Sequence, residues 1–283
     1  MIRPILYKAI KLFFTIVLVY FVYSKLKDID FSILSFASLS LWLLPCMVMY
    51  FISKFFSMNR LFLLQQKNNL STTFNYHTQL YLLGMFYNIF LPGGLGGDVY
   101  KAYRMNKDFN TSLQLTGIVL FMDRIIGLIS ILLFIIAIYL ISFDLSYFIL
   151  ITASIVYIIY YLLLQKISFT SPLIEIYSIL SQGFQILIVY ILMHSLSVKL
   201  NEEGYILLFL FSSITGMLPI SIGGIGVREA IMLAGAPHLG LNSELAILIG
   251  FLFYLITLIS SLPGFIIHLL SPFLKIKNYA GNY

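Results

Sequence analysis

Long hydrophobic runs recur along the whole chain of 283 residues, and short polar stretches separate them. The runs approach about 20 residues, the length at which an α-helix crosses the hydrocarbon core of a bilayer. Unbroken runs such as 125–141 and 245–262 predict helices rather than strands. The pattern therefore predicts an all-α integral membrane protein with eight apolar segments, at residues 8–24, 41–59, 76–91, 112–141, 146–164, 173–198, 204–220 and 244–270.

Composition agrees with the pattern and excludes several kinds of protein. Charged residues make up 10% of the chain, against about 25% in a soluble domain. The net charge of +6 comes mostly from short loops between spans, where the positive-inside rule explains it, so we expect no nucleic-acid partner. The single cysteine, Cys46, lies in an apolar run, so we expect no internal disulfide, metal site or cofactor.

Two glycine-rich stretches, residues 92–98 and 219–229, interrupt this pattern beside the apolar segments 76–91 and 204–220. Irregular backbone at membrane depth is tolerated only where it is buried in protein or lines a wet cavity. Glycine lets the chain turn sharply and lets a ligand approach the backbone closely. We therefore expect both segments to enter the membrane and turn back at the glycines.

The basic residues favour six full spans and two half-entering segments, with both termini cytoplasmic. Twelve basic residues then lie on the cytoplasmic side and three, Lys25, Lys27 and Lys199, outside. Eight full spans would give a weaker bias of nine against six. The twelve are Arg3, Lys8, Lys11, Lys54, Arg60, Lys67, Lys101, Arg104, Lys107, Lys166, Lys275 and Lys277.

This arrangement divides the single membrane domain, residues 1–283, into an internal repeat. Residues 1–143 and 144–283 each give two spans, a glycine-broken segment and another span, with opposite orientation in the membrane. Inverted repeats with broken segments in matching positions point to a transport site near the middle of the membrane.

Five charged residues fall in or beside the breaks or inside a span. Asp98, Asp123, Arg124, Arg228 and Glu229 are costly there unless they pair or face a cavity. Asp123 and Arg124 are neighbours on a helix and point about 100° apart, so we expect them to have different partners. Arg124 could reach Asp98 or Glu229. An arginine fork suits phosphate, but these charges could instead only tie the two halves together.

Together the breaks and charges predict one anion-binding site, because free N–H groups at a helix start also attract phosphate. A simpler explanation, close helix packing through Gly93 and Gly97, accounts for the glycines but not for the charges. Lys101, Arg104 and Lys107 either steer lipid headgroups or only set the topology. Glu175 fits an interfacial position. The candidate substrate-binding residues are Gly93, Gly94, Gly96, Gly97, Asp98, Asp123, Arg124, Gly223, Gly224, Gly226, Arg228 and Glu229.

Three motifs resemble the flippase-like transmembrane domain of lysylphosphatidylglycerol synthases and their stand-alone relatives. They are NIFLPGGLGGDVYKAYR at 88–104, LFMDRIIG at 120–127 and LPISIGGIGVREA at 218–230. The resemblance implies that the protein moves a polar lipid between leaflets. We expect this chain to have no soluble aminoacyl-transferase domain. One departure is notable, since the family usually has an arginine in the last span, whereas residues 250–264 contain none and Tyr254 lies at about that place.

The leading hypothesis is therefore a lipid flippase-like transporter in the cell inner membrane, which moves an anionic or polyprenyl-phosphate-linked lipid and has membrane lipids as its partners. One alternative is a polytopic glycosyltransferase that uses a polyprenyl-phosphate sugar, suggested by the D-x-D of Asp28 and Asp30, a pattern able to bind a divalent cation. The other is a non-transporting partner of a lipid or glycan synthase. We expect no catalytic residues in the transporter.

Overall fold

The computed structural model describes residues 36–70, 72–90, 95–142, 171–198, 200–216 and 226–270, together with a few isolated positions. Every secondary-structure element within these ranges is a helix. The predicted spans 8–24 and 146–164 fall outside the continuous ranges, and so do Gly93, Gly94, Gly223 and Gly224. The all-α prediction is confirmed for the described part.

Four stretches in the described part are long and apolar enough to cross a membrane. They correspond to the predicted full spans 41–59, 112–141, 173–198 and 244–270. The helices that contain them are α2 (Phe36–Lys67), α5 (Leu113–Ser142), α7 (Pro172–Ser195) and α10 (Ser243–Ser260), which α11 (Leu262–Leu270) continues.

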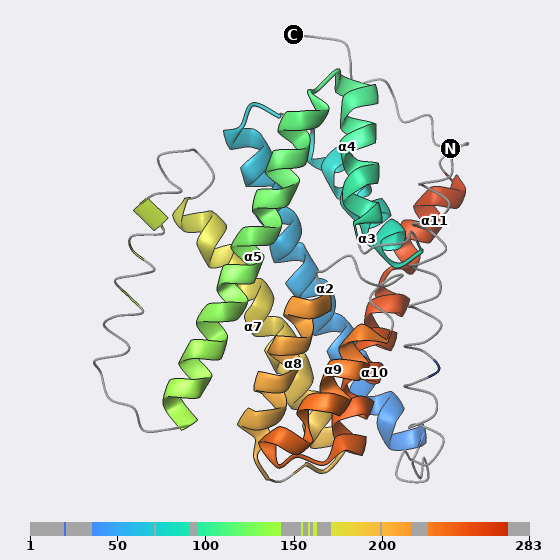
Figure 1. Cartoon of the computed structure of the whole chain (residues 1–283). Coiled ribbons are helices and arrows are strands. Elements are labelled where there is room, and N and C mark those ends of the chain that lie inside the picture. Colours follow the sequence, from blue (N-terminus) through green and yellow to red (C-terminus); the bar gives the residue numbers. More distant parts are fainter. Residues whose placement is uncertain are drawn as a thin grey trace, which may run out of the picture.

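Two pairs of shorter helices occupy opposite ends of this bundle (Figure 1). The upper pair is α3 (Phe74–Phe90) with α4 (Gly96–Phe109), and the lower pair is α8 (Glu202–Gly216) with α9 (Val227–Gly235) and the 3-10 turn η2 (Pro237–Leu239). Their α-helices have 17, 14, 15 and 9 residues, fewer than the roughly 20 that a span needs. In chain order, α3 and α8 match the two segments predicted to enter without crossing.

Local sequence explains where several helices begin. Ser171 accepts a hydrogen bond from the amide of Ile174, and Pro172 follows it at the first helical position of α7. Asn242 accepts from the amides of Glu244 and Leu245 at the start of α10, at 2.8 and 3.1 Å. These caps satisfy backbone donors that a helix start leaves unpaired.

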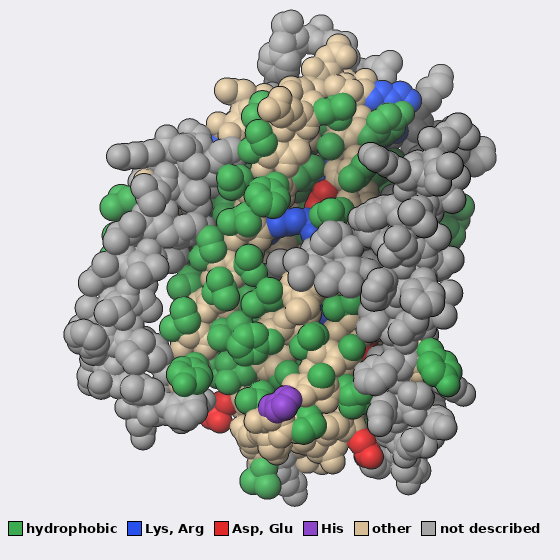
Figure 2. Space-filling view, in the orientation of Figure 1, with side chains coloured by type: hydrophobic (Ala, Val, Ile, Leu, Met, Phe, Trp, Pro, Cys, Tyr) green, Lys and Arg blue, Asp and Glu red, His purple; other side chains and the backbone are tan. Residues whose placement is uncertain are grey.

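Hydrophobic side chains cover much of the described surface in the middle of the bundle (Figure 2). Phe121 on α5 and Leu187 on α7, for example, are 59% and 48% exposed. Such a surface suits contact with lipid chains, because the hydrocarbon core offers no partner for polar groups.

Small polar residues hold α2 and α7 together along the centre of the bundle. The hydroxyls of Ser57 and Ser181 lie 2.6 Å apart, and the Ser53 hydroxyl donates to the Ser181 carbonyl at 2.9 Å. Ser53 and Ser181 are fully buried. Small residues let membrane helices approach closely, and hydrogen bonds between the helices add to their association.

Glycine also brings α3 and α4 into direct contact. The Gly97 amide donates to the Asn88 side chain at 2.9 Å, and a Cβ at Gly97 would collide with the Gly84 carbonyl. The obstacle is backbone, which cannot rotate away as a flexible side chain does.

We therefore expect Gly97→Ala to lower the free energy of unfolding by about 1–3 kcal/mol, the usual cost of overpacking. Gly117→Ala on α5 is the matched control, since a Cβ there meets nothing within 4 Å. Thermal unfolding of both variants in detergent checks this. Equal unfolding temperatures for the two variants would contradict the close contact between α3 and α4.

Candidate functional site

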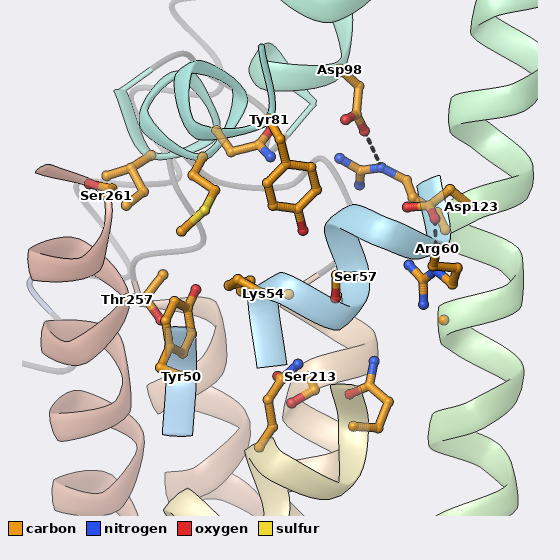
Figure 3. Close-up of a pocket in the computed structure, with 18 of the residues that line it drawn as sticks. Tyr50, Lys54, Ser57, Arg60, Tyr81, Asp98, Asp123, Ser213, Thr257 and Ser261 are labelled. Atoms are coloured by element: carbon orange, nitrogen blue, oxygen red, sulfur yellow. Dashed lines mark hydrogen bonds and ion pairs between the residues drawn. The ribbon is translucent and has the colours of Figure 1, made fainter. Parts of the chain in front are cut away.

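A cavity of about 300 Å³ lies at the centre of the bundle, where the upper helix pair meets α2, α5, α7, α8, α9 and α10 (Figure 3). Two carboxylates and five basic side chains line it, so the positive charges predominate. The carboxylates are Asp98 and Asp123, and the basic residues are Lys54, Arg60, Lys101, Arg124 and Arg228.

The α3/α4 side of the cavity carries Asp98 with two cations. The Arg124 Nε lies 2.6 Å from one Asp98 oxygen, and the Lys101 Nζ lies 3.1 Å from the other. Lys101 is buried, and its ammonium also lies 4.9 Å from the centre of the Tyr81 ring. Of the two partners considered for Arg124, Asp98 is the one that it contacts.

Asp123 pairs with Arg60 of α2 across the bundle. The Arg60 Nε lies 2.7 Å from Asp123 Oδ1, and its Nη1 donates to the Ser178 hydroxyl of α7 at 2.9 Å. One guanidinium with 6% exposure thus joins α2, α5 and α7. Asp123 and the adjacent Arg124 have different partners, as the helical geometry predicted.

These ion pairs bear on the alternative that the charges only tie the two halves together. The four ion pairs of the described residues all join residues between 60 and 124, within the first half. The Asp123–Arg60 pair also reaches the second half through Ser178 of α7, so a role of these charges in tying the two halves together stays a prediction. Three of the four pairs, those made by Arg60, Lys101 and Arg124, lie along the cavity.

On the α9 side, Arg228 faces aromatic rings instead of a carboxylate. Its guanidinium carbon lies 5.0 Å from the Phe209 ring centre and 4.6 Å from that of Phe253. The Arg228 Nη1 is buried and has no hydrogen-bond partner among the described residues. Lys54 has a similar environment, with its ammonium 4.9 Å from the Tyr50 ring centre.

Glu229 has a structural position at the start of α9. Its carboxylate accepts a hydrogen bond from the Gly226 amide at 2.9 Å, and Gly226 has a φ of 81°, in the left-handed region that favours glycine. Glu229 is buried and is not among the cavity-lining residues. Glu229, the other partner considered for Arg124, thus contacts the Gly226 amide, whereas Arg124 contacts Asp98.

The predicted site residues divide into three groups. Asp98, Asp123, Arg124 and Arg228 line the cavity together. Gly96, Gly97, Gly226 and Glu229 are buried where α4 and α9 begin. Gly93, Gly94, Gly223 and Gly224 lie outside the described residues.

Three assignments made from the sequence need correction. Lys54, Arg60 and Lys101 were assigned to the cytoplasmic side, but the structure places them along the cavity. The reason for Lys54 and Arg60 is that α2 continues to Lys67, well beyond the predicted end of that span at 59. Glu175, expected at an interfacial position, is 5% exposed and lies in the first turn of α7.

The sequence contained a signal for the α2 residues. Tyr50, Lys54 and Ser57 recur at helical spacing on one face of an apolar run, as a cavity-lining face would. Gln182 and Gln185 of α7 line the same cavity, and the Gln185 side chain donates to the Ser53 hydroxyl of α2 at 3.3 Å.

The missing arginine of the last span does not leave the cavity poor in positive charge. Lys54, Arg60 and Lys101 add three cations to Arg124 and Arg228. From α10 itself, Phe253 and Thr257 line the cavity.

A family model described as the lysylphosphatidylglycerol synthase TM region matches residues 8–173 and 170–264. These two stretches include every residue that lines the cavity. Neither the curated proteins nor the solved structures provide a match to the chain.

Proposed function

The chain belongs to the lysylphosphatidylglycerol synthase transmembrane-region family, and on this premise we propose that it is a flippase-like transporter of lipids. It moves an anionic or polyprenyl-phosphate-linked lipid between the leaflets of the inner membrane. The observation that carries the proposal is the cavity itself, in which five basic side chains and two carboxylates meet inside a bundle of apolar helices.

The cost of buried charge supports this function. Ionisable groups at membrane depth are expensive and usually mark a substrate or ion pathway. An anionic headgroup would compensate the excess positive charge of this cavity. Its volume of about 300 Å³ is at the lower end of ligand pockets, roughly 300–1,000 Å³, which suits a headgroup whose acyl chains stay in the bilayer.

The two opposed helix pairs support a transport mechanism. We infer that α3 with α4 and α8 with α9 enter the membrane from opposite faces and meet at the cavity (Figure 1). Residues 1–143 and 144–283 then form an inverted repeat, the arrangement in which one half rocks against the other around a central site.

Charge at the two ends of the bundle supports cytoplasmic termini. The upper end carries Lys67, Arg104 and Lys107, whereas the lower end carries the acidic residues Glu202, Glu203 and Glu244 (Figures 1 and 2). Without the three cavity residues, the positive-inside bias is nine against three, compared with seven against five for eight full spans. The upper end is thus the cytoplasmic one.

Reconstitution tests the proposed transport. The full-length protein in phosphatidylcholine vesicles should give an impermeant reductant access to fluorescent phosphatidylglycerol of the inner leaflet. We expect Arg124→Gln to slow this transfer at least tenfold, about 1.4 kcal/mol, because Arg124 faces the cavity. The control is Arg104→Gln, which removes the same charge from an α4 arginine that does not line the cavity and pairs with Asp108.

Two results would overturn the proposal: no transfer of any anionic lipid, or equal transfer by the wild type and Arg124→Gln. A non-transporting partner of a lipid or glycan synthase would then be the better description. Asp28 and Asp30, which motivated the glycosyltransferase alternative, lie outside the described residues.

A further inference from the structure

The five cations of the cavity fall into two classes by their partners. Arg60, Lys101 and Arg124 each contact a carboxylate at 3.1 Å or less. Lys54 and Arg228 make no ion pair with any described residue. Both residues are half-buried, and the Arg228 Nη1 is fully buried. A cation withdrawn from water without an ion-pair partner is costly, so these two are the positions where a ligand would contribute most.

Lys54 and Arg228 are also connected in space through one aromatic pair. The Lys54 ammonium lies over the Tyr50 ring, and the Arg228 guanidinium lies over the Phe253 ring. The Tyr50 and Phe253 rings contact each other edge to face, with centroids 6.0 Å apart. The two cations therefore occupy adjoining rings in one wall of the cavity.

Near this wall neutral polar groups line the cavity, whereas the two cavity carboxylates, Asp98 and Asp123, pair with Lys101, Arg124 and Arg60. Gln185, Ser213 and Thr257 line the same cavity and offer neutral hydrogen-bonding groups. Glu229, which follows Arg228, contributes its carboxylate to the Gly226 amide. Arg228 retains a buried Nη1 without a hydrogen-bond partner in the described part of the chain.

We propose that Lys54 and Arg228 together bind the phosphate of a lipid phosphomonoester, a dianionic group. This assignment rests on the proposed function and specifies its substrate class. A phosphomonoester carries about −1.5 to −2 charges at pH 7, which matches two cations. A phosphodiester carries one negative charge and would leave one of the two cations uncompensated.

The shapes of the two side chains determine how each of them would contact the phosphate. The planar guanidinium of Arg228 donates two parallel hydrogen bonds to phosphate oxygens, and the Lys54 ammonium acts as a point charge on a third. The cations on the α4 and α5 side already have carboxylate partners and are left to contact the rest of the headgroup. The Tyr50 and Phe253 rings cover one side of the two cations, and the lower local dielectric there strengthens both contacts.

Lipid titration of the purified full-length protein tests the assignment. The probes are dioleoyl phosphatidic acid, a phosphomonoester, and dioleoyl phosphatidylglycerol, a phosphodiester with the same acyl chains, each read as an increase in unfolding temperature. We expect at least tenfold tighter binding of phosphatidic acid at pH 7.5. Because the second phosphate pKa is near 6, this preference should shrink at pH 5.

The variants Lys54→Gln and Arg228→Gln should each reduce the preference at least fivefold. Lys107→Gln is the matched control, because Lys107 also lies over a tyrosine four residues earlier, Tyr103, but is exposed and outside the cavity. Arg228→Lys keeps the positive charge, so it tests the same site if Arg228→Gln does not fold. It should bind phosphatidic acid more weakly than the wild type and still prefer it to phosphatidylglycerol.

The outcomes separate this assignment from the proposed transport. Equal binding of the two lipids, or a preference that survives both glutamine variants, would overturn the phosphomonoester site even if Arg124-dependent transfer is observed. A retained preference without any lipid transfer would support the site and refute transport. Competition by inorganic phosphate at the concentration of the lipid would show that the ligand is free phosphate, which would overturn the lipid assignment.

Discussion

Asp123→Asn is expected to lower the free energy of unfolding by about 3–5 kcal/mol, because it leaves the buried Arg60 guanidinium without its carboxylate. The Arg60 side chain is 7% exposed, and its Nε lies 2.7 Å from Asp123. The hydroxyl of Ser178, which accepts from Nη1, carries no charge and cannot replace that partner. Reversible unfolding in mixed detergent micelles, followed through Trp42 fluorescence, gives the free energy.

Two further variants make this measurement specific. Asp108→Asn removes a carboxylate from the more accessible pair with Arg104, with side-chain exposures of 21% and 23%, and should cost less than about 1 kcal/mol. The double substitution Arg60→Met with Asp123→Leu removes both charges and should recover most of the loss, since an apolar pair of similar volume is often as stable as a buried ion pair. If Asp123→Asn lowers the free energy of unfolding by no more than Asp108→Asn does, the burial of Arg60 does not depend on its ion pair with Asp123.

Asp98→Asn is expected to change stability and lipid affinity in opposite directions. Asp98 contacts both Lys101 and Arg124, so the substitution leaves two cations without their carboxylate. The free protein should lose about 3–5 kcal/mol of stability. The same two cations become available to a ligand, so phosphatidylglycerol should bind at least tenfold more tightly, about 1.4 kcal/mol.

The unfolding temperature measured at increasing lipid concentration reports both the stability and the lipid affinity of one sample. The lipid-free Asp98→Asn protein should unfold at a lower temperature than the wild type, and added phosphatidylglycerol should raise that temperature by more, since ligand binding to the folded state stabilises it. Weaker binding of phosphatidylglycerol by this variant would show that Asp98 assists the lipid directly instead of competing with it.

The sequence predicts the long helices well because their signal is local. The apolar runs behind α5, α7 and α10 are as long as a bilayer core is thick, and nothing else in a protein commonly requires that length. The two segments predicted to enter the membrane without crossing it correspond to α3 and α8, and glycines beside them mark them locally. For Arg124 the sequence offers two partners, Asp98 and Glu229, and only the structure selects Asp98.

The rest of the site depends on contacts that no local pattern contains. In the sequence Arg60 follows the apolar segment 41–59, and a basic residue at that place usually extends to the membrane surface. Only the position of α5 and α7 beside α2 shows that it is buried. The aromatic environment of Arg228 likewise combines Phe209 of α8 with Phe253 of α10, which are far apart in the chain.

The serine contacts between α2 and α7 have a consequence for how the chain assembles after insertion. Helices in a bilayer gain nothing from excluding water, so they find each other through close packing and hydrogen bonds. Ser53 and Ser57 meet Ser181 more than 120 positions later in the sequence. We expect α2 to remain in the membrane without this packing partner until α7 has been synthesised. The cavity between them is therefore completed only late in biogenesis.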